Sequence, residues 1–179
     1  MMKFAHMADC HIGSWRDPKL KDVSTIAFQK AIDKCIEEAV DFILISGDLF
    51  NTSLPRIDNL KTVVTSLKQL KDKDIPAYII AGSHDYSPSG KTMLDVLEQA
   101  GLLINVVKGQ EVDGKLKLNF TVDKKTGAKI TGMLGKRYSL EKEYYEKLVL
   151  ENLEQEQGYK IFMLHSGIDE LKPEDQQNI

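Results

Sequence analysis

Short apolar runs alternate with amphipathic stretches through the first part of the chain. The runs cover residues 3–8, 42–46, 77–81 and 102–107. Apolar side chains at helical spacing cover residues 24–39 and 58–70, and a third helix is expected from 89 to about 100. Ser24 and Ser89 are the expected N-caps of the first and third helices. Buried strands separated by helices predict β-α-β units and a mainly parallel sheet.

The pattern changes in the second part of the chain. Residues 115–122 and 128–134 alternate like two antiparallel strands joined by a turn at 123–127. A single charged amphipathic helix is expected over 138–157 and another buried strand over 159–164. We expect one domain over residues 1–168, followed by a polar tail at 169–179.

Composition and charge are those of an ordinary globular domain. Of the 179 residues, 42% are hydrophobic and 28% charged, and the formal net charge is −3. This balance argues against a passive basic nucleic-acid coat protein, but not against an enzyme whose metal ions supply positive charge. No apolar run approaches the roughly 18 residues that span a bilayer. We therefore expect no membrane association and a cytoplasmic location.

Polar side chains and glycines gather where the predicted strands end. These residues are Asp9 and His11, Gly47 and Asp48, Gly82 to Asp85, and His165. Carboxylates and imidazoles at one sheet edge supply the mixed ligands that suit Mn²⁺, Fe²⁺ or Zn²⁺. In an extended chain Asp9 and His11 would point the same way, and Asp48 could bridge two ions.

The order of these blocks resembles the calcineurin-like metallophosphoesterases. Within that family, FAHMADCHIG (residues 4–13) and DFILISGDLF (residues 41–50) are similar to the Mre-type double-strand-break repair nucleases. The resemblance extends to about residue 168. It implies an α/β fold, a sandwich of two mixed sheets flanked by helices (αββα).

The resemblance also implies roles for the site residues. Asp9, His11 and Asp48 would hold one ion, and Asp48 and His165 the other. His84 would be a non-ligand histidine that faces the scissile phosphate and is oriented by Asp85.

Two departures from the family pattern affect the second ion and the activity of this chain. Ser83 stands where the family usually has an asparagine ligand, so it would be a weaker ligand of the second ion. The last family block, Gly-His-x-His, should follow His165 but is not found there, so we expect the domain to be truncated before its last ligand block, and the sequence does not settle whether Ile179 is a natural end. The 179-residue chain itself is therefore expected to be weakly active or inactive, with one ion bound poorly or not at all.

The function implied is metal-dependent hydrolysis of DNA phosphodiesters, with Mn²⁺ as the cofactor. The resemblance further suggests 3′-to-5′ exonuclease and single-strand endonuclease activity in double-strand-break repair, a homodimer, and a Rad-type ABC ATPase partner. Trp15 and Arg16 follow the first ligand block and could flank bound DNA, although an ordinary loop anchor explains them equally well.

Two other functions fit the same residues. A non-catalytic DNA-binding or dimerisation subunit would keep the fold while its metal site degenerates. A phosphodiesterase acting on a small cyclic nucleotide would use the same chemistry. Only the closeness of the first two blocks to the repair nucleases favours DNA over the small substrate.

Overall fold

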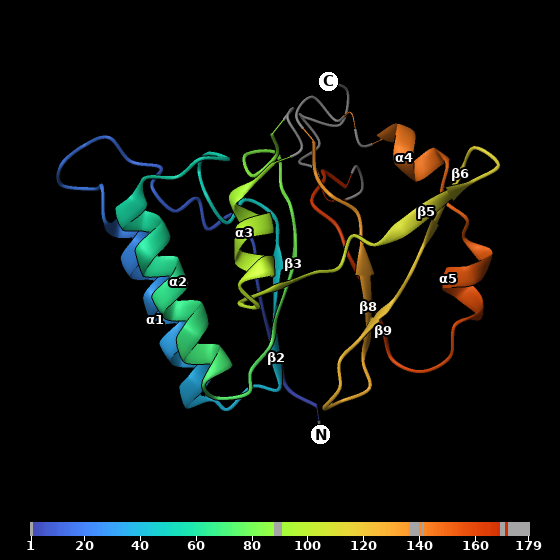
Figure 1. The fold of residues 1–179 in the computed structure, drawn as a ribbon, viewed down its shortest axis with the longest axis horizontal. Coiled ribbons are helices and arrows are strands. Elements are labelled where there is room, and N and C mark those ends of the chain that lie inside the picture. The colour runs from blue at the N-terminus through green and yellow to red at the C-terminus, as the bar shows by residue number, and fades with distance from the viewer. Residues whose placement is uncertain (1, 88–90, 137–139, 141, 169–170, 172–179) are drawn as a thin grey trace.

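The computed structural model describes residues 2–87, 91–136, 140, 142–168 and 171. Its central layer is a four-stranded parallel sheet (Figure 1). The strands, in order, are β1 (Phe4–Met7), β2 (Phe42–Ser46), β3 (Ala77–Ile80) and β4 (Ile104–Asn105). The predicted order of strands and helices in this part of the chain is confirmed, and the second strand has the predicted bounds.

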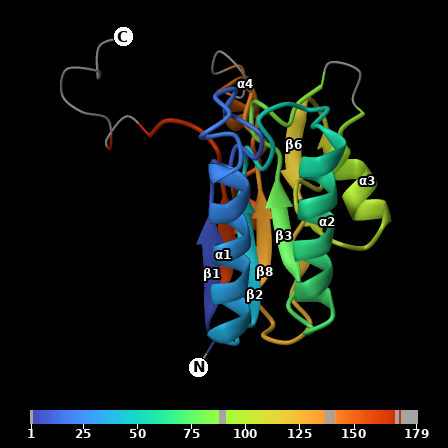
Figure 2. The ribbon, with the colours of Figure 1, turned by 90° about the vertical axis from the view of Figure 1, so that its left-hand side faces the viewer.

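Three helices cover one face of this sheet (Figure 2). They are α1 (Val23–Glu37), α2 (Ile57–Lys71) and α3 (Met93–Gln99). The cap predicted at Ser24 is wrong, because α1 begins one residue earlier and the Ser24 hydroxyl accepts the Gly13 amide at 3.3 Å. Ser89 lies outside the described residues, and α3 is capped by the reciprocal contacts of Thr92 and Asp95.

A second, three-stranded sheet packs on the other face. It contains β7 (Thr121–Val122), β8 (Lys129–Gly132) and β9 (Lys160–Met163). The pair β7 and β8 is antiparallel while β8 and β9 are parallel, so this sheet is mixed, whereas the described strands of the first are all parallel. With α5 (Glu151–Gln155) beyond it in Figure 1, the layers are those of the expected αββα sandwich.

Alternation along the central strands produces two cores. One face of β2 and β3 packs on the helices through Ile43, Ile45 and Ile79. The other face, with Leu44 and Ile80, packs on the second sheet. All five residues of β2 are buried because both of its faces are covered. Rigid strands therefore end together beneath the polar loops at the upper edge in Figure 1.

The hairpin region departs from prediction. The strand expected over 115–122 divides into β6 (Lys115–Leu118) and β7, and β6 pairs with the unpredicted β5 (Gly109–Val112). The antiparallel pair across the turn at 123–127 is confirmed, but only β7 and β8 form it. The two-stranded sheet of β5 and β6 is separate from both layers of the sandwich.

The single helix expected over 138–157 is wrong. The described residues of this stretch contain two short helices, α4 (Lys142–Glu146) and α5, while 138, 139 and 141 lie outside them. The chain between the two helices pairs with β6, because the Leu116 amide donates to the Lys147 carbonyl at 2.7 Å and the Val149 amide to the Leu116 carbonyl at 3.0 Å. Apart from Leu171, the expected polar tail is also outside the described residues. Within the part of the chain that is described, no helix has the length and apolar character needed to span a bilayer.

Candidate metal centre

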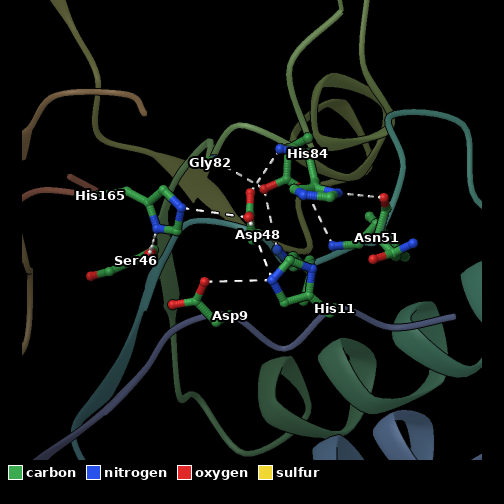
Figure 3. Close-up of polar contacts among 11 residues, drawn as sticks. Asp9, His11, Ser46, Asp48, Asn51, Gly82, His84 and His165 are labelled. Atoms are coloured by element: carbon green, nitrogen blue, oxygen red, sulfur yellow. Dashed lines mark hydrogen bonds and ion pairs between the residues drawn. The ribbon is translucent and has the colours of Figure 1, made fainter. Parts of the chain in front are cut away.

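Four segments meet at the carboxyl ends of the strands, as Figure 3 shows. Asp9 and His11 follow β1, Asp48 follows β2, His84 follows β3 and His165 follows β9. The structure thus brings together side chains separated by as many as 156 positions, the interval from Asp9 to His165.

The first ligand block is held by backbone contacts to the second. The Asp9 amide donates to the Gly47 carbonyl at 3.1 Å, and the His11 amide to the Asp48 carbonyl at 2.9 Å. Asp9, His11 and Asp48 have φ values of 52°, 42° and 50°. The expected extended conformation of Asp9 and His11 is therefore wrong. Left-handed backbone, which L-residues adopt at a cost, turns these side chains toward one another instead.

Asp48 is the centre of the cluster and is only 3% exposed. Its Oδ1 accepts the backbone amide of His84 at 2.8 Å. Its Oδ2 lies 3.5 Å from Nε2 of His11 and 3.5 Å from Nε2 of His165. Nε2 of His11 also lies 3.5 Å from Oδ1 of the exposed Asp9.

The donor atoms form two groups that share Asp48. One consists of Asp9, Asp48 and His165, and the other of His11, Asp48 and His84, with the donor atoms of each group within 4.8 Å of one another. The resemblance had instead placed His11 with Asp9 and had left His84 without a metal. In both assignments Asp48 is shared by the two ion positions.

The ring of His165 is oriented by a backbone carbonyl. Its Nδ1 lies 2.8 Å from the Ser46 carbonyl oxygen. A carbonyl only accepts, so Nδ1 carries the hydrogen and Nε2 is directed at Asp48. Contact with Asp48 raises the pKa of His165 to about 9, although burial opposes the shift. Burial acts to raise the pKa of Asp48, yet hydrogen bonds from His165 and His84 outweigh it and lower that pKa.

The expectation that Asp85 orients the ring of His84 by direct contact is wrong. Nδ1 of His84 lies 2.8 Å from the carbonyl oxygen of Asn51, which therefore orients the ring. The ring of His84 packs edge-on against that of His11, with centroids 4.8 Å apart.

Asp85 has a different role in the structure. It is 1% exposed and accepts the backbone amides of Leu49, Phe50 and Gly82 at 3.0 to 3.2 Å. Burial raises the pKa of Asp85, and the three amides oppose this. The carboxylate thus ties the loop after β3 to the loop after β2.

Several contributing residues escaped the sequence analysis. Ser46 and Asn51 act through backbone carbonyls, which any residue possesses, so their side chains carried no signal. Gly82 was among the residues predicted at the strand ends, but its role was not: it lies against Asp48, where a β-carbon would overlap the carboxylate. Its position directly after a buried strand was the available signal.

Comparison with known proteins identifies the family. The model of the calcineurin-like phosphoesterases matches residues 2–178, almost the whole chain. The chain belongs to the calcineurin-like phosphoesterase family.

This phosphoesterase is similar to archaeal DNA double-strand break repair proteins named Mre11. It is 31% identical to that of Archaeoglobus fulgidus over 95% of this chain and 40% of the relative. For Methanocaldococcus jannaschii the identity is 33%, over 97% of this chain and 46% of the relative. For Methanococcus maripaludis it is 40%, over 49% and 24%. The phosphoesterase chain thus spans less than half the length of these relatives.

The remaining predicted site residues of the phosphoesterase lie around this centre. Ser83 is half-buried in the turn between Gly82 and His84, and its assignment as a ligand stays a prediction. Trp15 and Arg16 are exposed in the loop after His11, so the structure leaves them accessible to a partner. A DNA contact there also stays a prediction.

The donor set of the phosphoesterase fits divalent cations. It combines carboxylate oxygens and imidazole nitrogens around one buried acid, which suits first-row divalent ions. The carbonyl behind His165 supplies the outer contact typical of a metal-binding histidine. Family membership and geometry therefore agree on a divalent-metal phosphoesterase site.

Proposed function

We propose that this phosphoesterase is a metal-dependent DNA nuclease of double-strand-break repair, with 3′-to-5′ exonuclease and single-strand endonuclease activity. The observation that carries the proposal is the position of Asp48 between two donor groups. The names of the archaeal relatives support DNA as the substrate. Residues 1–168 would form the nuclease unit, and a Gly-His-x-His block, in a chain that carries one, would complete its ligand set.

The proposed cofactor is Mn²⁺, in two sites that share Asp48. Asp9, His11 and Asp48 would hold one ion, because Nε2 of His11 lies 3.5 Å from an oxygen of each carboxylate. Asp48 and His165, whose Nε2 lies 3.5 Å from Asp48, would hold the other ion, with Ser83 as a weak neutral ligand. When bound, the ions would neutralise phosphate charge and lower the pKa of a water molecule. The buried Asp48, held by the His84 amide, would position both ions without reorganisation.

His84 is the proposed acid-base group at the leaving oxygen. Because Nδ1 donates to the Asn51 carbonyl, Nε2 is the nitrogen that would give or take a proton at the substrate. Asp85 would contribute indirectly, since its three amide contacts hold the loop that carries His84.

The proposed assembly extends beyond the single chain. Trp15 and Arg16 would flank bound DNA. A homodimer is supported by two exposed apolar side chains: Leu54, in the segment before α2, is 75% exposed, and Ile57, the first residue of α2, is 79% exposed. The resemblance to the repair nucleases supports a Rad-type ABC ATPase partner.

Asp48→Asn, with Asp123→Asn as a matched control, tests the proposed function. Both carboxylates are almost fully buried. Asp123, however, accepts the hydroxyl of Tyr78 at 2.7 Å, and Tyr78 belongs to the core between the two sheets. We expect Asp48→Asn to abolish Mn²⁺ binding in calorimetry and Mn²⁺-dependent hydrolysis of end-labelled single-stranded DNA, while Asp123→Asn retains both.

Other outcomes of these experiments would indicate a different function. DNA binding without hydrolysis under any divalent ion, in a chain extended through the Gly-His-x-His block, would indicate a non-catalytic subunit. Hydrolysis of cyclic nucleotides with none of DNA would indicate a small-molecule phosphodiesterase. Equal Mn²⁺-dependent rates for the extended chain and this one would contradict the expected need for the downstream histidines.

A further inference from the structure

Two tyrosines and a lysine form a cluster beside the metal centre. Nζ of Lys136 lies 4.1 Å from the ring centroid of Tyr144 and 5.8 Å from that of Tyr86. It also donates to the Tyr144 hydroxyl at 2.7 Å. These distances place one cation within cation-π range of two aromatic rings.

The backbone attaches this cluster to the candidate ligands. Tyr86 directly follows Asp85, whose carboxylate ties its loop to the loop of Asp48. Lys136 directly follows Gly135, which is so close to His165 that a β-carbon at position 135 would overlap the imidazole. Helix α4, which carries Tyr144, lies at the same upper end of the molecule as these loops (Figure 1).

The rings of this cluster remain accessible. Tyr86 is 42% exposed and Tyr144 is 38% exposed, whereas a tyrosine serving only the core would be covered, as Tyr78 is at 2%. Exposed aromatic faces next to a fixed cation are the elements with which proteins hold unpaired bases, because every base offers a stacking face and its phosphate a negative charge. The net charge of −3 makes a local cation more significant for binding a polyanion.

The geometry points to Tyr86, Lys136 and Tyr144 as a binding site for an unpaired nucleotide of the DNA substrate. The rings stack on a base, and Lys136 holds the two rings and faces the adjoining phosphate. This site rests on the proposed nuclease function and deepens it: a base must leave its duplex partner to reach the rings, so single-stranded ends are the preferred substrate.

Binding without metal tests the site independently of catalysis. In the intact protein with EDTA present, fluorescence anisotropy compares an oligothymidylate with an abasic oligonucleotide of equal length and charge. The unmodified protein binds the oligothymidylate more tightly. Tyr86→Ala and Tyr144→Ala each weaken that binding by about 5- to 150-fold and bring it toward the abasic level.

Matched variants separate stacking from other roles. Tyr86→Phe and Tyr144→Phe retain the oligothymidylate preference, because the ring and not the hydroxyl stacks. Lys136→Met weakens binding of both oligonucleotides, since the phosphate is common to them. Tyr159→Ala, which removes another exposed ring just before β9, changes neither affinity.

Each contrary result has a distinct meaning. No preference for oligothymidylate in the unmodified protein, or unchanged affinity in both alanine variants, overturns the stacking site. Loss of preference in the phenylalanine variants overturns it too, because a hydroxyl would then be responsible. Failure of the unmodified protein to hydrolyse bis(p-nitrophenyl) phosphate with Mn²⁺ contradicts the proposed function, and the binding comparison still decides the site.

Discussion

Gly82 lies directly against the carboxylate of Asp48, so that a β-carbon at position 82 would overlap both Oδ1 and the backbone nitrogen of Asp48. Gly47 has the same relationship to His165, and its φ of 84° adds a second requirement for glycine. Gly82 and Gly47 therefore leave the space in which the side chains of Asp48 and His165 contact each other.

Gly82→Ala is expected to destabilise the fold by about 1–3 kcal/mol and to weaken Mn²⁺ binding, because the added methyl displaces the Asp48 carboxylate. Denaturant titration and calorimetry measure the two effects. Gly114→Ala is the control, since a β-carbon there meets open space and only its φ of 74° resists the change. It should cost some stability and leave Mn²⁺ affinity intact. Unaltered Mn²⁺ affinity in Gly82→Ala would contradict the tight packing at Asp48.

Asp85→Asn is expected to destabilise the protein by about 1–3 kcal/mol, because an amide has one acceptor oxygen for three backbone donors and loses the negative charge. Asp33→Asn, on the exposed side of α1, should stay within about 0.5 kcal/mol. Urea unfolding provides the comparison. If Asp85→Asn removed hydrolysis and left stability unchanged, Asp85 would be a catalytic residue and its structural role would be secondary.

His84→Ala, in a chain carrying the complete ligand set, should lower DNA hydrolysis by about 10²–10⁴-fold while Mn²⁺ affinity changes little. The expectation follows from the proposed position of Nε2 at the substrate. The closeness of His84 to His11 and Asp48 supplies the competing outcome. Parallel loss of metal and activity would make His84 a ligand.

The Asp48 and His165 pair predicts how stability depends on pH in the metal-free protein. The pKa of His165 is raised from 6.5 to about 9, so its contribution is complete below about pH 6.5 and is lost as pH rises toward 9. The pKa of Asp48 is lowered from 3.8, so its contribution is lost as pH falls below that value. The stability lost in His165→Gln should therefore be largest between about pH 4 and 6.5.

Thermal unfolding of both proteins in EDTA across this range measures that difference. Between pH 6.5 and 9 the difference should decline by an amount on the order of 3 kcal/mol, because each pH unit between the two pKa values of His165 corresponds to about 1.4 kcal/mol. A difference that stayed constant with pH would show that the two groups do not form an ion pair in solution.

The layered fold could be predicted because its central strands are buried on both faces. The continuous apolar residues of β2 favour a strand between two covering layers, and the helical spacing between strands supplies one of those layers. The second part of the chain was harder to predict. Residues 138–157 have the periodicity of a helix, but pairing of residues 147–149 with Leu116 in β6 interrupts it, and such a partner is invisible in local sequence.

In the candidate site, too, some features could be predicted from the sequence and others could not. Asp9, His11, Asp48, His84 and His165 could be identified from sequence, because parallel strands end at one edge whatever their separation along the chain. The groups that orient these side chains could not be identified from the sequence. Asn51 and Ser46 act through carbonyls, and Asp85 forms its bonds with amides of the neighbouring loop rather than with the adjacent His84.

The sequence by itself therefore determined which side chains gather at the end of the sheet, since the order of the strands along the chain and their apolar periodicity can be read from local sequence. Only the tertiary structure decided how they face one another. The left-handed turns at Asp9, His11 and Asp48 and the sharing of Asp48 by two donor groups depend on loops that pack against other loops. The cluster of Tyr86, Lys136 and Tyr144 depends on two loops that meet helix α4. Such contacts join residues far apart in the chain, and no periodicity encodes them.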